Sequence, residues 1–485
     1  MRWTIEEVAR ALGVAPPAGL DPLARLAGVS IDSRTVARGD LFVAIHGPRH
    51  DGHDFVGAAV DAGAVGAVVA QGRAGEYAEA VRGKLFGVAD TLAALQGLAN
   101  AVRTRWGKRL VAVTGSAGKT TTKEILAALL SARLCVLKSE GNLNNEYGLP
   151  LQLLRLEEEH EAAVVEMGMS HAGELRRLAE IARPDVGVVT RVAPVHLEFF
   201  GSVDKIALAK RELIEGLAGR GSVAVLNADD MRVARFAEVA PGRILTFGIS
   251  PRADFHAENV EDWGVEGTAF DFVAPAGRAR LSLRLPGRHN ISNALAALAA
   301  ASVWGIGADE ASEVFPDLEP TGMRGRLLHY DAGFSVINDC YNSNPVALVA
   351  MVELLARTHT PGRRILVAGE MLELGRASPE LHREAGHTAA GIGSLDWIIG
   401  VQGEASSFVR GAIEGGHPAK QTNFFPSSAE AAEFIAGFVR SKDLLLVKGS
   451  RGVKMERIVE ALDARYPRQN HEPAGAAPEP LNRLG

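Results

Sequence analysis

The sequence predicts an α/β protein whose sheets are mostly parallel. Short apolar segments alternate with amphipathic segments along the chain, which is the order of strands and helices in parallel sheets. A glycine-rich loop at residues 114–121 lies between one such strand and one such helix, an arrangement typical of nucleotide-binding sheets. The length of 485 residues is enough for about three domains.

Three domains of different kinds are expected from this order. We place a smaller N-terminal α/β domain in residues 1–105, a central phosphate-loop domain of the ATPase type in residues 106–318 and a C-terminal Rossmann-like domain in residues 319–466. Residues 467–485 are rich in Pro, Ala and Gly, and we expect them to form a disordered tail.

The N-terminal domain is predicted from two apolar runs, residues 40–45 and 64–70, which read as strands. Residues 55–62 form the helix between them, and a second helix over residues 91–105 leads to the glycine-rich loop.

The central domain continues after the loop with three buried strands at residues 162–166, 185–190 and 222–226. Residues 254–285 alternate between apolar and polar side chains, which predicts an antiparallel edge. An alanine-rich helix begins at residues 288–293.

The third domain shows four further apolar strands separated by helical segments. They lie at residues 334–338, 364–368, 397–400 and 444–447, and their order predicts a Rossmann-like sheet.

Composition excludes several classes of protein. The net charge of −6 does not favour general nucleic-acid binding, and two cysteines, Cys135 and Cys340, provide neither a disulfide framework nor metal-ligand spacing. The N-terminus has no apolar signal core, and no stretch approaches the roughly 20 apolar residues of a membrane helix. We expect a cytoplasmic monomer with small-molecule partners, no nucleic-acid partner and no membrane insertion.

The glycine-rich loop carries the most specific chemical signal. Gly115 and Gly118 allow backbone N–H groups to turn toward an anion at the start of a helix. Lys119 can reach terminal phosphates, and the Thr120 hydroxyl can bind Mg²⁺. Val113 stands where the common pattern has a glycine, so the loop is a shorter variant. The alternative is a glycine turn with an incidental lysine.

Two further residues follow buried strands of the central domain. Glu166 closes one strand, where a carboxylate can hold Mg²⁺ beside phosphates or, alternatively, cap a neighbouring helix. His196 follows the next strand and, taken alone, is an ordinary loop histidine. Lys210 lies in the helical segment 203–213, and the pattern alone predicts a surface lysine. Asn290 and Asn293 lie at a helix start, where they can cap the helix or contact a purine edge.

Two strand-end loops of the third domain are rich in polar side chains. Residues 339–345 end in Pro345, which is suited to open the next helix. Residues 448–451 contain two cations, which bind phosphate or carboxylate or else lie in a solvated turn.

These motifs together resemble the Mur ligase family of bacterial cell-wall synthesis. The resemblance extends over all three segments to about residue 460. Its carriers are residues 32–34, 39–45, 51–55, 114–124, 141–150, 166–174, 196–198, 209–212, 325–326, 339–345 and 448–451.

The resemblance implies a three-domain ligase that uses ATP and Mg²⁺. The N-terminal domain would hold the UDP part of the substrate, the central domain would bind ATP, and the C-terminal domain would close over both. By the same resemblance, Lys119, Glu166, His196 and Lys210 are catalytic, Thr120, Glu166 and His196 are metal ligands, and Lys210 occupies the position that carries a carbamate in several members. Nucleotide contacts would come from Gly115, Ser116, Ala117, Gly118, Lys119, Thr120, Thr121, Asn290, Arg326 and Asp339, and substrate contacts from Ser33, Arg34, Asn145, Tyr341, Asn342, Asn344, Lys448 and Arg451.

The implied reaction is ATP-driven amide formation between UDP-N-acetylmuramoyl-tripeptide and D-alanyl-D-alanine, through an acyl phosphate. It would serve peptidoglycan synthesis and, through it, cell shape and division. Two segments depart from the usual pattern. In the third domain, Asn338 stands before Asp339 where an aspartate is common, and Cys340 replaces a serine. Before His196, the position of a common asparagine is Thr190 or Arg191.

Three other functions are compatible with parts of this sequence. The ligase that adds the third amino acid usually has an Asp-Asn-Pro-Arg segment, which this chain lacks, and folylpolyglutamate synthase lacks a first domain like residues 1–105. A phosphate-loop nucleotide switch would leave residues 319–460 unexplained.

Overall fold

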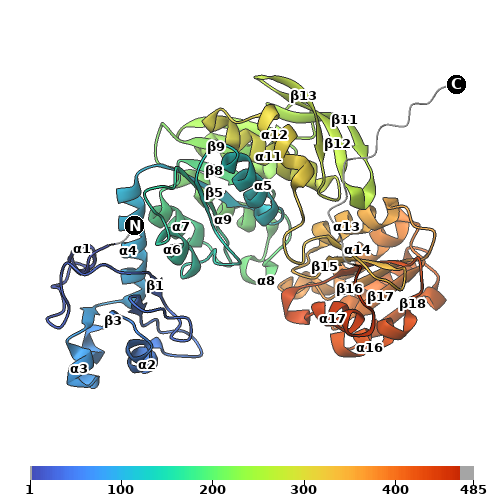
Figure 1. Ribbon diagram of the computed structural model, residues 1–485. Coiled ribbons are helices and arrows are strands. Elements are labelled where there is room, and N and C mark those ends of the chain that lie inside the picture. Colours follow the sequence, from blue (N-terminus) through green and yellow to red (C-terminus); the bar gives the residue numbers. More distant parts are fainter. Residues whose placement is uncertain (1–2, 470–485) are drawn as a thin grey trace. The chain divides into compact units, whose positions relative to one another are not determined.

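The computed structural model describes residues 3–469 and separates the chain into two compact units. The first unit holds the described residues of Met1–Asp262, Glu266–Glu319 and Glu373–Gly375, and the second holds those of Trp263–Val265, Pro320–Leu372 and Arg376–Gly485. Figure 1 shows the helices and strands of both units.

The N-terminal part of the first unit contains a small parallel sheet. Within the described residues its strands lie in the order β1-β2-β3-β4, with bounds Val29–Ser30, Leu41–Val43, Gly66–Ala70 and Leu85–Val88. Three short helices accompany the sheet: α1 (Ile5–Leu12), α2 (Val56–Asp61) and α3 (Glu79–Arg82).

Helix α4 (Thr91–Trp106) joins this small sheet to the rest of the unit. Its N-terminus is capped by the Asp90 carboxylate, which accepts from the N–H groups of Leu92 and Ala93. Its buried face belongs to a hydrophobic core that runs from Trp3 and Ile5 to Leu149 and Leu175. The domain boundary expected between residues 105 and 106 therefore falls at the end of a helix that packs against both the N-terminal part and the central part of the unit.

The central sheet of this unit is mostly parallel. In the described chain its strand order is β13-β12-β11-β10-β9-β8-β5-β7-β6, and only the β11–β12 and β12–β13 pairs are antiparallel. The strand bounds are β5 Arg109–Thr114, β6 Val136–Lys138, β7 Ala162–Glu166, β8 Val186–Val189, β9 Val223–Asn227, β10 Arg243–Gly248, β11 Phe255–Asp262, β12 Thr268–Ala274 and β13 Gly277–Leu283.

Helices cover both faces of the central sheet, because side chains of a strand alternate between faces. On β5, Leu110 and Ala112 join the core of α4, α6 (Gly148–Leu153), α7 (Glu174–Ala182) and α9 (Val203–Glu215). Val111 and Val113 join the opposite core, with α5 (Lys119–Ser131) and α11 (His289–Ala301) (Figure 1). The remaining helices of the unit are α8 (Leu197–Phe200), α10 (Met231–Ala234) and α12 (Ala308–Val314).

The second unit is built on one further sheet. Among the described residues its strand order is β14-β15-β19-β16-β17-β18, parallel except for the β14–β15 pair. The strands are β14 Arg326–His329, β15 Ser335–Asp339, β16 Arg364–Gly369, β17 Trp397–Val401, β18 Thr422–Phe425 and β19 Leu444–Lys448. The helices are α13 Pro345–Arg357, α14 Ser378–Ile392, α15 Ala405–Glu414, α16 Ser428–Phe438 and α17 Glu456–Arg465.

The expected α/β class is confirmed, together with the strands and helices named from the sequence and the antiparallel edge over β11–β13. Six strands were not expected from the sequence: β1, β4, β6, β10, β14 and β18. At the end of the described residues, Arg468 forms an isolated antiparallel β-bridge with Tyr330, and the Gln469 N–H donates to the His329 carbonyl. The expectation of a disordered tail concerns residues 467–485, of which 470–485 lie outside the described residues.

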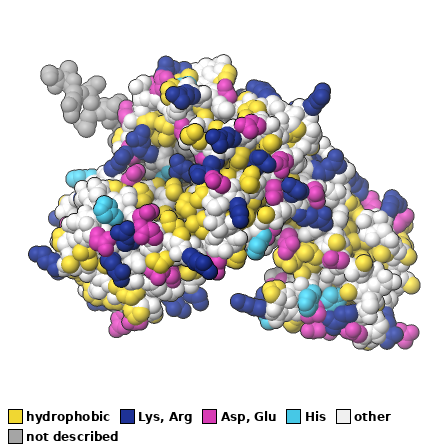
Figure 2. Space-filling model, turned by 180° about the vertical axis from the view of Figure 1, so that it is seen from behind, with side chains coloured by type: hydrophobic (Ala, Val, Ile, Leu, Met, Phe, Trp, Pro, Cys, Tyr) yellow, Lys and Arg dark blue, Asp and Glu magenta, His cyan; other side chains and the backbone are white. Residues whose placement is uncertain are grey.

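None of the helices in residues 3–469 combines the length and the apolar character that a membrane-spanning segment needs. On the face drawn in Figure 2, Lys and Arg side chains are interspersed with Asp and Glu side chains. This face therefore presents mixed charge rather than an extended positive field.

Candidate active site

The phosphate loop connects β5 to α5 as expected. Gly115 has φ +151° and Gly118 has φ +83°, and a Cβ atom at these positions would lie 1.8 Å from Thr190 Oγ1 and 2.2 Å from Asn293 Oδ1. Only glycine fits there without displacing a neighbour. The loop therefore turns tightly into the N-terminus of α5, where backbone N–H groups and the helix dipole favour an anion.

The loop is held from behind by the segment that follows β8. The Thr190 hydroxyl donates to the Ala117 carbonyl at 2.6 Å, and the Ser116 N–H donates to the Arg191 carbonyl at 2.7 Å. Lys119 Nζ donates to the Gly115 carbonyl at 2.9 Å across the loop. One departure from the family pattern lies here, since the asparagine that is common before the histidine loop is Thr190 or Arg191 in this chain, and both residues support the phosphate loop directly.

Glu166 lies at the end of β7, the strand beside β5. Its carboxylate accepts a hydrogen bond from the Thr120 hydroxyl at 2.7 Å and one from Asn144 Nδ2 at 2.9 Å. The first contact brings together the two predicted oxygen ligands of Mg²⁺. Asn144 was not expected as a site residue: the motif at residues 141–150 marked its loop, but only the neighbouring Asn145 was predicted to act there.

This oxygen set fits Mg²⁺. Mg²⁺ prefers hard oxygen ligands and is usually held by one or two carboxylates together with substrate phosphates and waters. A hydroxyl and a carboxylate beside a phosphate loop supply that kind of site. Within residues 3–469, no group of three or more His, Cys, Asp or Glu side chains is arranged to hold a metal, so the phosphates would have to complete the coordination.

Lys210 corrects an expectation. The helix pattern predicted a surface lysine, but only 2% of Lys210 is exposed on α9. The reason is its place on the helix: the buried stripe of α9 also contains Ile206 and Leu213. Burial and then the charge of Lys119 hold the pKa of the Lys210 amine well below its usual value, although the Glu166 charge acts in the opposite direction.

His196 occupies an unusual backbone position just before α8. Its φ of +54° lies in the left-handed region, which is uncommon for a residue with a side chain and often marks functional segments. Its ring nitrogen Nδ1 contacts the carboxylate of Glu373, which belongs to the same unit. Hydrogen bonding from His196 lowers the pKa of the Glu373 carboxyl, although burial opposes this shift.

The asparagines at the start of α11 bind each other rather than capping the helix. Asn290 Nδ2 donates to the Pro286 carbonyl at 2.8 Å, and Asn293 Nδ2 donates to Asn290 Oδ1 at 2.8 Å. The side chain of Asn293 also lies directly against Gly118 of the phosphate loop, where it leaves no room for a Cβ atom. The pair is therefore part of the wall of the phosphate loop.

The predicted substrate residues Ser33 and Arg34 lie in a turn after β1. The Arg34 guanidinium donates to both carboxylate oxygens of Asp32, at 2.9 and 2.6 Å. These hydrogen bonds lower the pKa of Asp32 to about 2. In the central part of the unit, Asn145 Oδ1 accepts from the Gly148 N–H at 2.9 Å and thereby holds the start of α6.

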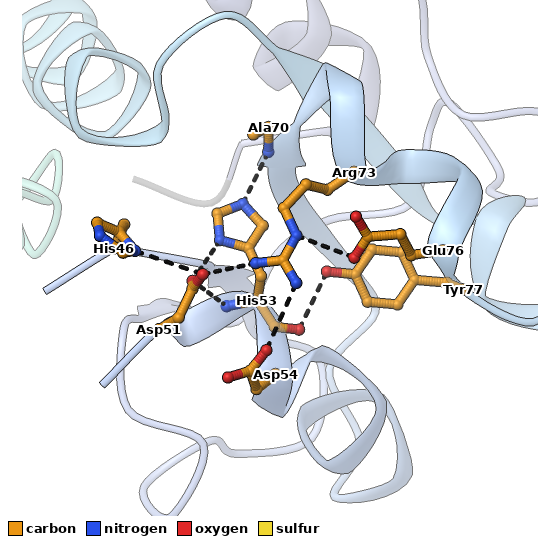
Figure 3. A network of polar contacts seen from close by, with 8 residues as sticks. All are labelled: His46, Asp51, His53, Asp54, Ala70, Arg73, Glu76 and Tyr77. Atoms are coloured by element: carbon orange, nitrogen blue, oxygen red, sulfur yellow. Dashed lines mark hydrogen bonds and ion pairs between the residues drawn. The ribbon is translucent and has the colours of Figure 1, made fainter. Parts of the chain in front are cut away.

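A polar network fixes the segment 51–55, one of the motifs that carries the family resemblance (Figure 3). His53 Nε2 accepts from the Ala70 N–H at 2.9 Å, so Nδ1 carries the proton and donates to Asp51 at 2.7 Å. Arg73 also donates to Asp51, at 2.5 Å. Burial acts to raise the pKa of Asp51, but hydrogen bonds from His53 and His46 outweigh it and hold the pKa well below its usual range. Both ring nitrogens of His53 are occupied, which favours a structural role.

The second unit contains its own buried polar cluster at the ends of β15 and β19. Lys448 Nζ donates to Asp339 Oδ2 at 2.5 Å and to the Asn342 carbonyl at 2.8 Å. Both charged residues are buried. Of the two interpretations of residues 448–451, a solvated turn is therefore wrong for Lys448.

The other predicted residues of this unit surround that cluster or lie apart from it. Asn344 Oδ1 accepts from the Ala347 N–H at 2.9 Å and caps α13, whose first residue is Pro345, as expected. Tyr341 packs beneath the Arg324 guanidinium, 4.0 Å from the ring centroid. Arg451 pairs with Glu456 at 3.2 Å, and Arg326 is exposed on β14.

Comparisons with known proteins match the chain along most of its length. Residues 25–103 match the model of the Mur ligase family catalytic domain, residues 113–301 the Mur ligase middle domain, and residues 323–451 the Mur ligase glutamate ligase domain. The UDP-N-acetylmuramoyl-tripeptide–D-alanyl-D-alanine ligase of Bacillus subtilis is 35% identical over 437 residues, which cover 90% of this chain and 93% of that protein.

Solved structures are similar over a comparable extent. The crystal structure of MurF from Acinetobacter baumannii has a TM-score of 0.85 at 30% identity and covers 95% of this chain and 99% of that one. MurF from Thermotoga maritima, solved in complex with ADP, has a TM-score of 0.78 at 30% identity and covers 90% and 97%.

Proposed function

Because this chain belongs to the Mur ligase family, we infer that it joins D-alanyl-D-alanine to UDP-N-acetylmuramoyl-tripeptide at the expense of ATP. The observation that carries this inference is the match to ligases of that name over about nine-tenths of both chains. The intact phosphate loop beside Glu166 supplies the chemistry that such a reaction requires. The product is the UDP-linked pentapeptide precursor of peptidoglycan.

The reaction needs an activated carboxyl group, because an amine cannot displace oxide from a carboxylate. A carboxylate oxygen of the tripeptide attacks the γ-phosphorus of ATP, and ADP leaves with the electrons of the broken P–O bond. The amine of D-alanyl-D-alanine then attacks the acyl phosphate, loses a proton and releases phosphate. The loop N–H groups and Lys119 stabilise the charge that collects on the phosphoryl oxygens.

We assign the metal site to oxygen atoms already in contact. Thr120 and Glu166 would hold Mg²⁺, and the geometry that supports this is the 2.7 Å hydrogen bond between them. When bound, Mg²⁺ neutralises phosphate charge. His196 is the third ligand in the proposal; it follows β8, the neighbour of β5, and its left-handed backbone is of the kind that often marks functional segments.

Lys210 is the proposed site of a carbamate. Burial holds the pKa of the Lys210 amine well below its usual value and so favours the neutral amine, the form that can add to CO₂, forming an N–C bond and releasing a proton. The carbamate would be an anion near Glu166 and Lys119. Its presence is tested by intact mass after trapping and by loss of activity in Lys210→Gln that short carboxylic acids restore.

For the other predicted residues we propose the ligand contacts that the family resemblance implies. Ser33 and Arg34 would contact the UDP-sugar, Asn290 the adenine, and Arg326 and Asp339 the nucleotide. Asn145, Tyr341, Asn342, Asn344, Lys448 and Arg451 would contact the peptide substrates. A monomer that works in the cytoplasm, where ATP and nucleotide-linked precursors are available, is part of the same proposal.

The test is phosphate release from ATP with Mg²⁺, omitting one substrate at a time. We expect release to require both UDP-N-acetylmuramoyl-tripeptide and D-alanyl-D-alanine, with a UDP-pentapeptide as product by mass. Release driven instead by a UDP-dipeptide and a diamino acid would assign the chain to the neighbouring ligase, and release indifferent to both would leave a nucleotide switch. Lys119→Ala should abolish turnover with an unchanged circular dichroism spectrum, and normal turnover would refute the role of the loop.

A further inference from the structure

A second lysine of α5 is buried without a part in the proposed chemistry. Lys123 is 1% exposed and lies one helical turn after Lys119. Its Nζ donates to the Ser139 carbonyl at 2.6 Å and pairs with Glu124 at 2.8 Å. A buried ammonium group is costly unless it is paired and hydrogen-bonded, so its placement calls for a specific interaction partner.

The partner, Ser139, lies where β6 meets β7. These strands are parallel, with Lys138 opposite Val164, and the Ser139 N–H donates to the Val164 carbonyl at 2.9 Å. In a regular parallel ladder the Glu166 N–H would donate to the Ser139 carbonyl. Instead it donates to the Ser139 hydroxyl oxygen at 3.0 Å, and Lys123 takes the carbonyl.

The regular hydrogen bonding between β6 and β7 therefore stops at Ser139, just after the last residue of β6, Lys138. The chain then continues into the loop that carries Asn144. Asn144 Nδ2 donates to the Glu166 carboxylate at 2.9 Å, and the backbone carbonyl of Asn144 accepts from the Gly168 N–H at 2.9 Å. Glu166 is therefore fixed at its backbone by Ser139 and at its carboxylate by Asn144. Ser139 makes the first contact itself, and the loop that makes the second begins directly after it.

We propose that Lys123 is a positioning residue of the metal–nucleotide site, acting on Glu166 through Ser139 and the Asn144 loop. The proposal rests on the function proposed above, because it assumes that Glu166 holds the metal. Without the Lys123 ammonium group, the Ser139 carbonyl is free to return to the ladder, and the loop that presents Asn144 shifts with it. Glu166 then loses the orientation that suits a metal bound beside Thr120.

The test replaces Lys123 with methionine, which keeps the length of the side chain and removes the charge. Lys138→Met is the matched control, because Lys138 pairs with the same Glu124 carboxylate, at 2.6 Å, but does not contact the Ser139 carbonyl and is half exposed. The readout is Mn²⁺ binding to the full-length protein with ADP, followed by electron paramagnetic resonance. We expect about tenfold weaker Mn²⁺ binding in Lys123→Met, as for other residues that orient metal ligands, and less than a twofold change in Lys138→Met.

Two outcomes would overturn the proposal. Mn²⁺ affinity within twofold of wild type in folded Lys123→Met would leave the residue with a purely structural role. If Lys123→Met does not fold, Ser139→Ala decides: it removes the acceptor of the Glu166 N–H, and unchanged Mn²⁺ affinity would contradict the relay. Failure of the proposed function is distinguishable, because the wild-type protein would then bind no Mn²⁺ with ADP or would not form the pentapeptide.

Discussion

The buried ion pair between Lys448 and Asp339 gives a prediction whose size follows from the structure. Lys448→Met removes the cation that lies 2.5 Å from the Asp339 carboxylate and 2.8 Å from the Asn342 carbonyl. The side chains of Lys448 and Asp339 are 4% and 12% exposed, so water cannot replace the lost ammonium group fully. The Asp339 carboxylate is left buried and uncompensated.

The expected cost is about 3–5 kcal/mol, which is typical for removing one partner of a buried pair. Against a domain stability of about 5–15 kcal/mol, this is a large share. Since each 1.4 kcal/mol is a factor of about ten, amides that exchange by opening of this unit should exchange at least about a hundredfold faster.

The assay is hydrogen exchange by mass spectrometry on the full chain, with peptides that cover β15 and β19. Lys420→Met is the control, because Lys420 is exposed in the same unit. Adding Asp339→Asn to Lys448→Met removes the stranded charge and should recover at least tenfold of the lost protection. Acceleration below threefold in Lys448→Met would refute the reasoning that this pair stabilises the unit.

Two further predictions concern the first unit. Gly118→Ala places a Cβ atom 2.2 Å from Asn293 Oδ1 on a residue with a φ of +83°. The substitution costs about 1–2 kcal/mol of backbone strain and also displaces Asn293. The affinity for ADP, measured by calorimetry, should therefore fall at least tenfold. Gly141→Ala, at φ +62° with nothing within 4 Å, carries only the strain, and equal affinities in the two variants would contradict the clash. The pKa of Asp32, measured by NMR, should be about 2 and should rise to near 3.8, the ordinary value of an aspartate, in Arg34→Ala. Because the folded pKa is depressed, this pair stabilises the fold above about pH 4, and the contribution is lost as the pH falls through 2; an unshifted Asp32 would contradict the pairing.

The phosphate loop and Glu166 could be predicted because their signals are local. A buried apolar strand that ends in a carboxylate, or that runs into glycines and a lysine, is visible in a few consecutive residues. Strands β14 and β18 were not predicted, because each is only four residues long. Both also lie at a sheet edge, where a strand does not need an apolar run.

The buried lysines show where local patterns mislead. Lys210 was expected at the surface because charged residues surround it in the sequence, yet it shares the apolar stripe of α9 with Ile206 and Leu213. Lys123 likewise lies on the buried side of α5, with Leu126 and Leu130. The position of each lysine on an apolar stripe could have predicted that it is buried. Its hydrogen-bond partner, such as the Ser139 carbonyl for Lys123, could not be predicted, because only the tertiary fold brings the two together.

The most direct test of the central claim follows one oxygen atom through the reaction. UDP-N-acetylmuramoyl-tripeptide labelled with ¹⁸O in its terminal carboxylate is incubated with the protein, MgATP and D-alanyl-D-alanine, and the released phosphate is analysed by mass spectrometry. The account predicts one ¹⁸O atom in each phosphate, because the carboxylate oxygen that attacks ATP leaves with the phosphoryl group. Formation of the pentapeptide with unlabelled phosphate would contradict it.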